Sequence, residues 1–315
     1  MKNKEKYKKF CDTHPIPIFS QYWWLDSVCV GGEWDIILIE KGGQVVASMP
    51  YFLKKKGPFR SITMPLLTQT MGPYITYPNA QKYESKIAYE KKVMLELISN
   101  LPKVNRFNQN FHYSINNWLP FFWKGFNQTT RYTYTIENDT LDNIFSTFSS
   151  NMKNKIRKAS KIINVFDGSI NDMYSLSVKT FERQNLNVPF SLKYLKEMDS
   201  VCQKNNCRKI FLAQDNLNNK HSCLYLIWDK QSSYVHLVGE DPEFRNSGAG
   251  IFLIYEAIKF TFEKLKLKTF DFEGSMIESV EQVRRSCGGV QTPYFNITKN
   301  NSFISRIFKK AIQFL

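Results

Sequence analysis

The order of predicted elements repeats in the two halves of the chain, and this repeat limits the choice of fold more than any single motif. In the second half, runs rich in apolar residues predict three strands joined by short turns, which form an antiparallel meander. A helix from about Gly250 to Leu265 follows, and a further strand is predicted over Lys268–Gly274. The three strands of the meander are predicted at 208–214, 221–229 and 232–240.

The first half holds a fainter copy of this order. A hairpin is predicted over 34–53, with two glycines at its turn, and a helix over 84–100 precedes a strand over 104–112. The two copies differ at the start of the helix, because the segment 74–85 contains no glycine loop. If the copies share a fold, only the second can hold a phosphate with its backbone.

The length of 315 residues allows two domains of ordinary size, so core burial is not limiting. We therefore predict an α/β (α+β) protein of two lobes, residues 1–135 and 136–315. Each lobe is expected to hold a mixed, largely antiparallel sheet flanked by helices.

The formal net charge of +15 favours an anionic partner such as nucleic acid, a phosphorylated substrate or an acidic membrane surface. Lysine, asparagine and isoleucine are frequent throughout, so only local clusters of charge are informative. One such cluster has helical spacing and is either a solvated helix face or a groove for an anionic substrate or a tRNA end. It consists of Lys153, Lys155, Arg157, Lys158 and Lys161.

The six cysteines form no CxxC pair and no framework spacing, which predicts a reduced, cytoplasmic protein without a structural metal. The basic amino terminus is not followed by an apolar segment typical of a signal peptide, and no apolar run approaches the roughly 20 residues of a membrane-spanning helix. The segment Phe303–Leu315 has the pattern of a basic amphipathic helix. Such a helix either lies on the inner face of an anionic membrane or docks on the protein's own surface.

The segment Arg245–Gly250 reads RNSGAG and lies between a predicted strand and a predicted helix. A phosphate site built from backbone N–H groups needs residues without obstructing side chains, and Gly248 and Gly250 meet this need. The positive end of the helix dipole lies directly behind, and Arg245 can donate two hydrogen bonds to one phosphate. The alternative is an ordinary strand-to-helix turn, but the position before an amphipathic helix favours a phosphate loop.

These residues resemble the pyrophosphate loop of the GNAT acyltransferase superfamily, whose pattern is Arg/Gln-x-x-Gly-x-Gly/Ala. The resemblance implies an acyl-CoA co-substrate whose pyrophosphate lies on the loop, and no metal. It also implies that the acyl carbonyl is held near the splayed end of the preceding strand. The implied cofactor-binding residues are Val238, Arg245, Asn246, Ser247, Gly248, Ala249 and Gly250.

A narrower resemblance covers most of the chain and points to the FemAB-like branch, the peptidoglycan-bridge aminoacyltransferases and their relatives. It is carried by RKASK at 157–161, by FDFEGSM at 270–276 and by VRRSCGGVQTPY at 283–294. The resemblance implies two GNAT-like halves, the first a degenerate lobe that binds the acceptor. The long helical hairpin of several members has no heptad counterpart between 151 and 250.

The same resemblance implies substrate contacts at Arg157, Lys158 and Arg284. The branch often has lysine where this chain has Arg284, which keeps the charge but not the compact ammonium. In GNAT-like folds the linker between the first helices lines the acceptor site, and this implies substrate contacts at Arg183 and Gln184 as well.

Acyl transfer from a thioester needs a fixed carbonyl, donors for the oxyanion and an acceptor for the proton of the attacking amine. No GxSxG motif or Cys/His pair suggests a protein nucleophile. The proton-acceptor candidates are Glu240, Asp271 and Glu273, whereas His236 is interpreted as a core residue. Asp271 and Glu273 are two apart and would share a strand face, and their alternative role is as surface carboxylates or in an ion pair with Arg284 or Arg285.

The expected function is therefore N-acyl transfer from acyl-CoA, such as N-acetyl transfer, to an amine of a cell-envelope or polysaccharide precursor. One alternative is FemAB-type transfer of an aminoacyl group from tRNA to a peptidoglycan precursor. A second alternative is a non-catalytic module that binds RNA or an anionic glycan, because a fold does not fix a function.

Overall fold

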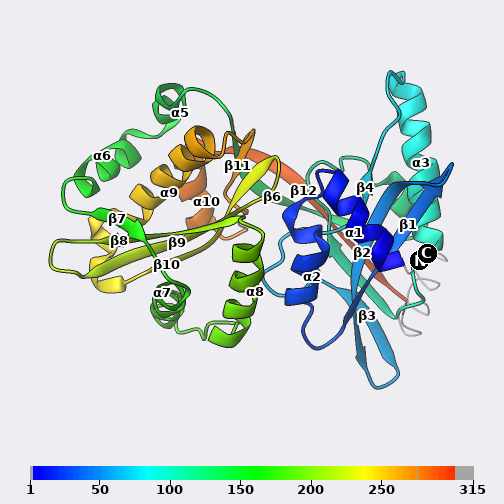
Figure 1. Cartoon of the computed structure of the whole chain (residues 1–315), viewed down its shortest axis with the longest axis horizontal. Helices are drawn as coiled ribbons and strands as arrows, with labels where there is room; N and C mark the ends of the chain where they lie inside the picture. The colour runs from blue at the N-terminus through cyan, green and yellow to red at the C-terminus, as the bar shows by residue number, and fades with distance from the viewer. Residues whose placement is uncertain (1–2, 275, 302–315) are drawn as a thin grey trace, which may run out of the picture. The chain divides into compact units, whose positions relative to one another are not determined.

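The computed structural model describes residues 3–274 and 276–301 and divides the chain into two compact units (Figure 1). Unit 1 consists of residues 1–131 together with the chain from Pro293 onward, and unit 2 is Tyr132–Thr292. The amphipathic segment predicted at 303–315 lies outside the described residues. None of the described helices is both long and apolar enough to cross a membrane.

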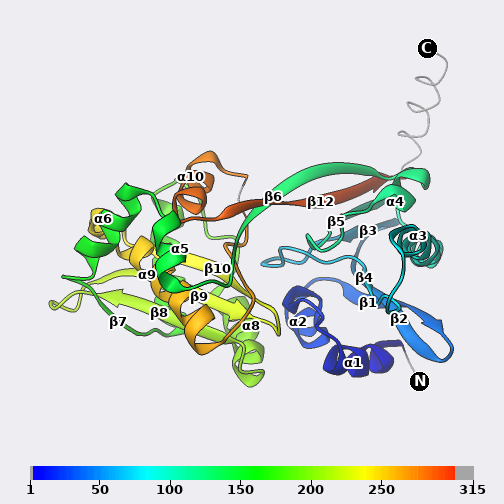
Figure 2. The ribbon, with the colours of Figure 1, turned by 90° about the horizontal axis from the view of Figure 1, so that it is seen from above.

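Unit 1 is built on an antiparallel hairpin whose two faces are both covered by helices. Strand β1 carries Trp34 toward helix α1 on one face, and Ile37 and Ile39 toward the core formed with α3 on the other (Figure 2). Strand β2 also pairs with β3, which pairs in parallel with β5. Its elements are α1 (Asn3–Thr13), α2 (Tyr22–Val28), β1 (Glu33–Lys41), β2 (Gln44–Lys56), β3 (Phe59–Thr63), β4 (Tyr74–Ile75), α3 (Tyr83–Ser99), β5 (Arg106–Asn110) and α4 (Leu119–Trp123).

Unit 2 holds a sheet in the order β6-β11-β10-β9-β8-β7. Neighbouring strands are antiparallel except β10 and β11, which are parallel. Helix α9 lies over one face of this sheet, and α7 lies on the other (Figure 1). Its elements are α5 (Leu141–Thr147), α6 (Ser150–Ala159), β7 (Asn164–Asp167), α7 (Ile170–Glu182), α8 (Leu192–Lys204), β8 (Arg208–Gln214), β9 (Lys220–Trp228), β10 (Ser232–Glu240), α9 (Ala249–Lys259), β11 (Thr269–Asp271) and α10 (Glu278–Ser286). The strands β6 (Asn127–Glu137) and β12 (Val290–Asn300) each contain residues of both units.

The predicted fold class is confirmed, since both units combine largely antiparallel strands with flanking helices. The apolar stripe that predicted a helix after Gly250 is buried in α9, where Ile254, Ala257 and Ile258 face the core. The helix then continues as one π-helical turn over Phe260–Lys264. Local periodicity therefore placed the main elements of the meander and its helix.

The end of the second predicted lobe differs from the structure. The chain from Pro293 onward belongs to unit 1, because the second half of β12 pairs with β5 and Asn296 lies opposite Asn110. The strand pattern of 290–300 is visible in the sequence, but nothing local identifies a partner this far away along the chain.

Candidate active site

The loop before α9 has the backbone conformation that its glycines permit. A 3-10 turn over Pro242–Ser247 leads to Gly248, whose φ of +77° lies in the left-handed region that disfavours residues with a Cβ atom. The N–H of Ala249 is bonded to Ser247 Oγ at 3.2 Å. Within the described part of the chain, the N–H groups of Gly250 and Ile251 have no hydrogen-bond acceptor. The first turn of α9 therefore presents unsatisfied donors at the positive end of its dipole.

The two glycines of this loop are also required by close packing. A Cβ atom on Gly248 would lie 3.1 Å from the carbonyl oxygen of Lys155 on α6, and one on Gly250 would lie 3.3 Å from Glu240 Oε1. Helix α6 buries Ile156 and Ala159, whereas Lys155, Arg157 and Lys158 are exposed. The basic face of α6 is thus placed beside the loop.

Glu240, at the end of β10, lies against the loop at Gly250 and is surrounded by positive charge. Burial raises the pKa of its carboxyl group, and the charges of Arg183, Arg245 and Lys155 oppose this shift. Its backbone N–H donates to Thr180 Oγ1 on α7 at 2.8 Å, which fixes the end of the strand. Three cations from α6, the end of α7 and the loop therefore converge on one carboxylate.

Of the two residues predicted at the end of α7, only Arg183 is brought to this region. The side-chain amide of Gln184 donates to the carbonyl oxygen of Thr180 in its own helix at 3.2 Å. It therefore closes the last turn of α7.

Strands β10 and β11 separate where the acyl carbonyl of a thioester was expected. They pair in parallel only from Ser232 opposite Thr269 to Tyr234 opposite Asp271, after which β11 ends and β10 continues to Glu240. Val238 pairs with Leu224 of β9 on one side. In the described chain no strand pairs with its other edge, so the backbone there can meet a ligand.

A buried network of carboxyl groups lies beyond the end of β11. Asp271 Oδ1 accepts hydrogen bonds from the hydroxyl of Thr133 on β6 and from the N–H of Glu273, the latter at 2.7 Å. His236 Nδ1 is hydrogen bonded to the Glu273 carboxylate at 2.9 Å. The side chain of His236 is 1% exposed and that of Glu273 is 12% exposed, so Glu273 is the more accessible of the pair.

Burial shifts the proton affinities in this network. It raises the pKa of Asp271 to about 7 and also raises the pKa of Glu273, where the charge of His236 opposes the shift. Arg284 lies with its guanidinium carbon 5.4 Å from the ring centroid of Phe272, and burial lowers its pKa. Neighbouring carboxyl groups whose pKa values are raised by burial are suited to general acid–base chemistry.

Two expectations about these carboxylates are corrected. Asp271 and Glu273 do lie together, but not through strand alternation, because β11 ends at Asp271 and Glu273 has a φ of +59°. Arg285 does not serve as their ion-pair partner, since its Nε binds Glu281 Oε1 at 3.0 Å.

Sequence reasoning missed Thr133 and Thr180, whose hydroxyl groups hold the network and the end of β10. No local signal marks either threonine, because each acts on a residue far away in the sequence. Among the described residues, no group of three or more His, Cys, Asp or Glu side chains is arranged to hold a metal ion.

The comparisons with known proteins agree with this geometry. Residues 146–278 match the family model described as the acetyltransferase (GNAT) domain, and no curated protein matches the chain. The crystal structure of FemX has a TM-score of 0.67 at 12% identity and covers 93% of this chain and 95% of its own.

Two further solved structures share the arrangement at lower TM-scores. A tandem GNAT protein from the clavulanic acid biosynthesis pathway has a TM-score of 0.53 at 9% identity, covering 95% of this chain and 94% of its own. The C-terminal domain of a putative lysylphosphatidylglycerol synthetase from Agrobacterium fabrum has a TM-score of 0.53 at 8% identity, covering 94% and 91%. Residues 146–278 therefore match the GNAT acetyltransferase domain, and the chain as a whole shares its fold with FemX and with a tandem GNAT protein.

Proposed function

We propose that the protein is an N-acyltransferase that moves an acyl group from acyl-CoA to an amine of a cell-envelope or polysaccharide precursor. The observation that carries this proposal is the loop Arg245–Gly250, where free backbone donors and three nearby cations form an anion site at the start of α9. The cell-envelope context is supported by the FemAB-like fold and by likeness to a lysylphosphatidylglycerol synthetase.

The residues at the loop fit the diphosphate of coenzyme A. The N–H groups of Gly250 and Ile251 would bind phosphate oxygens, and Arg245 would add a charged donor. A side chain at Gly250 would fill the space in front of Glu240, so the glycine keeps the site open. The unpaired edge of β10 at Val238 would receive the extended part of the donor.

The network around Glu273 would accept the proton of the attacking amine. In the reaction the amine nitrogen would form a bond to the thioester carbonyl carbon, the carbon–sulfur bond would break so that coenzyme A leaves as its thiolate, and the nitrogen would lose one proton to Glu273. Glu273 is the accessible carboxylate of the network, and its raised pKa brings it closer to the operating pH of a general base. We assign His236 and Asp271 to positioning it, because each makes a direct hydrogen bond to Glu273.

Glu240 takes a different role in this proposal. Its carboxylate lies against Gly250 among three cations, so it orders the basic side chains around the loop. It is therefore a positioning residue of the donor site.

A second candidate, transfer of an aminoacyl group from tRNA, is favoured by one observation. The exposed basic face of α6 lies beside the loop, where Lys155 contacts Gly248. An exposed helix face that carries lysine and arginine suits the phosphates of a nucleic-acid end.

The deciding experiment is calorimetric titration with coenzyme A and acetyl-CoA of the wild-type protein, the Gly248→Val variant and a Gly125→Val control. Gly125 also has a positive φ, of +75°, but no atom within 4 Å of its Cβ position, so it matches the backbone strain without the contact. We expect about micromolar binding that only Gly248→Val abolishes. Binding of charged tRNA without binding of coenzyme A would overturn the proposal in favour of the second candidate.

A further inference from the structure

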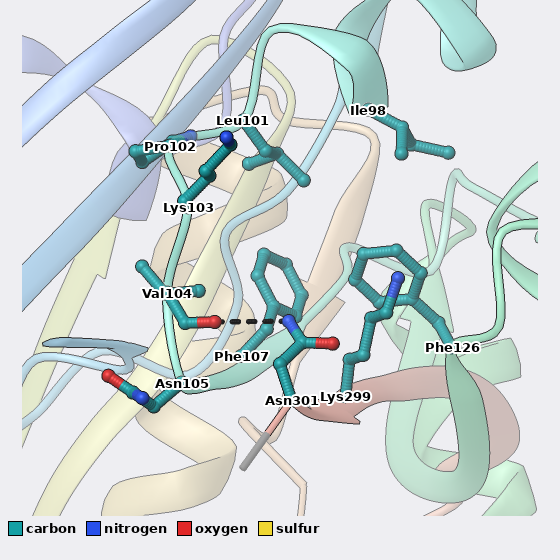
Figure 3. Close-up of a pocket in the computed structure, with 10 residues that line it drawn as sticks. All are labelled: Ile98, Leu101, Pro102, Lys103, Val104, Asn105, Phe107, Phe126, Lys299 and Asn301. Atoms are coloured by element: carbon teal, nitrogen blue, oxygen red, sulfur yellow. Dashed lines mark hydrogen bonds between the residues drawn. The ribbon is translucent and has the colours of Figure 1, made fainter. Parts of the chain in front are cut away.

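Unit 1 contains two hollows of different character. One, of about 450 Å³, is lined mainly by apolar side chains from α3, β5 and the loop between them (Figure 3). Its polar groups are already engaged: the side-chain amide of Asn301 donates to the Val104 carbonyl at 3.0 Å, and Lys299 Nζ donates to the Lys124 carbonyl at 2.7 Å. This hollow offers little to orient a polar ligand.

The other hollow, of about 770 Å³, is lined by charged side chains, and we name it the charged hollow. The strand register explains why these side chains meet. Glu33 and Asp35 on β1 lie opposite Leu53 and Tyr51 on β2, and alternation puts all four on one face of the hairpin. The lining residues are Asn3, Lys4, Glu33, Trp34, Asp35, Tyr51, Leu53, Lys55 and Arg60.

On the basic side of the charged hollow, two positive charges lie close together and repel each other. Lys55 on β2 lies directly opposite Arg60 on β3, and like charges at such positions repel. In residues 3–274 and 276–301 neither side chain makes an ion pair. A bound anionic group would relieve this repulsion.

The acidic side of the charged hollow holds two carboxylates that would be stabilised by a cationic group. Glu33 and Asp35 are exposed, and no described ion pair includes either carboxylate. Asp35 accepts only a long hydrogen bond, at 3.4 Å, from the Tyr51 hydroxyl among the side chains of the hollow. Further along β1, by contrast, Glu40 pairs with Lys6 at 2.6 Å, so this strand does form ion pairs where geometry permits.

We propose that the charged hollow binds a dipolar ligand that carries an ammonium group at one end and an anionic group at the other. The ammonium lies at Glu33 and Asp35, and the anionic group lies at Lys55 and Arg60. By the strand register, Arg60 is two strands across from Glu33 and two residues further along, so the two ends are offset by about 10 Å across the sheet and about 7 Å along it. Tyr51 and Leu53 form the floor between the ends. This proposal is independent of acyl transfer.

The test is calorimetric titration of the full chain with 6-aminohexanoate, at low salt because exposed charges are screened. Hexanoate and hexylammonium serve as single-charge probes, and glycine serves as a dipole that is too short to span the strands. We expect 6-aminohexanoate to bind more tightly than each of the three. Equal binding of hexanoate would overturn the dipolar site in favour of a plain anion site, and absence of saturable binding would overturn the proposal altogether.

Three variants locate the binding. Lys55→Gln and Asp35→Asn are each expected to weaken 6-aminohexanoate binding about fivefold, the value of one exposed charge pair. Lys56→Gln is the matched control, because Lys56 is the next residue on β2 and points to the other face. An equal effect of Lys56→Gln, or no effect of Asp35→Asn, would contradict the assignment.

Discussion

The two units both place a helix after antiparallel strands, but the starts of these helices differ in charge and shape. Helix α3 of unit 1 begins after Lys82, in an extended conformation, and carries Glu84 in its first turn. Helix α9 of unit 2 begins after Gly248, in a left-handed conformation, and has no acidic residue in its first turn. A carboxylate at a helix start interacts with the same dipole that would attract a phosphate. The same element order can therefore support an anion site in one unit and lack it in the other.

The two units also differ in the hydrogen-bond partners and the accessibility of their buried carboxylates. Glu90 on α3 is 5% exposed and accepts hydrogen bonds from the Tyr77 hydroxyl and from the Asn117 amide, the latter at 2.9 Å. Both donors are neutral and internal, as in a structural network. Glu273 of unit 2 is instead bonded to an ionisable side chain, His236, and remains partly accessible. Burial alone therefore does not identify a catalytic carboxylate.

Among the variants that test the difference between Glu273 and Glu90, Glu273→Gln is expected to have the largest effect on the rate of acyl transfer. Removing a general base lowers the rate of acyl transfer about 10²–10⁴-fold, while coenzyme A binding, which depends on the loop, is unchanged. The rate is measured as thiol release from acetyl-CoA with an amine acceptor. Glu90→Gln is the matched control and is expected to lower thermal stability but not the rate of the folded enzyme. Equal losses of rate in the two variants would show that Glu273 is also structural.

The pH profile separates a base from a merely structural carboxylate. A general base acts when it is deprotonated, so the wild-type rate rises with pH through the pKa of Glu273. Burial raises this pKa above the usual 4.5 for glutamate, so the midpoint lies above that value. Glu273→Gln removes this rise, and persistence of the same rise in the variant would assign it to another group.

An intermediate effect is expected on stability from Asp271→Asn. Because burial raises the pKa of Asp271 from the usual 3.8 to about 7, the folded state binds a proton that the unfolded state has lost in this range. The contribution of Asp271 to the free energy of unfolding is therefore largest below about pH 4. It falls by on the order of a few kcal/mol as the pH rises to about 7. The asparagine mimics the protonated acid and removes this loss. Chemical denaturation at a series of pH values measures it, and parallel curves for both proteins would contradict the assignment.

Local pattern was sufficient for the helices and strands of the repeat. The helix predicted over 84–100 is α3 (Tyr83–Ser99), and the strand predicted over 104–112 is β5 (Arg106–Asn110). Both follow from periodicities that extend over only a few residues. The partner of β12 did not follow, because strand pairing over this separation is decided by the packing of the whole unit.

The position of the loop Arg245–Gly250 in the fold also followed from local pattern, whereas other features of the candidate site did not. Composition and spacing singled out Arg245–Gly250, and the strand-to-helix position observed for this loop is the one that the motif requires. The hydrogen bond between Thr133 and Asp271 joins residues far apart in the sequence. The left-handed backbone conformation of Glu273 could not be predicted either, because the residue is not a glycine. Tertiary hydrogen bonds created these features, so periodicity and propensity could not reveal them.

The smallest effect that distinguishes the two helix starts is expected from Arg245→Ala compared with Lys82→Ala. Each change removes one positive charge just before a helix, but only α9 of the two helices lacks an acidic residue in its first turn. Loss of one charge-assisted hydrogen bond to phosphate weakens coenzyme A binding about tenfold, whereas Lys82→Ala leaves it unchanged. Titration at two salt concentrations also separates a direct contact from general attraction, because a contact to phosphate makes binding depend more steeply on salt. Equal weakening by both variants would mean that overall positive charge, and not the loop of unit 2, draws the donor to the protein.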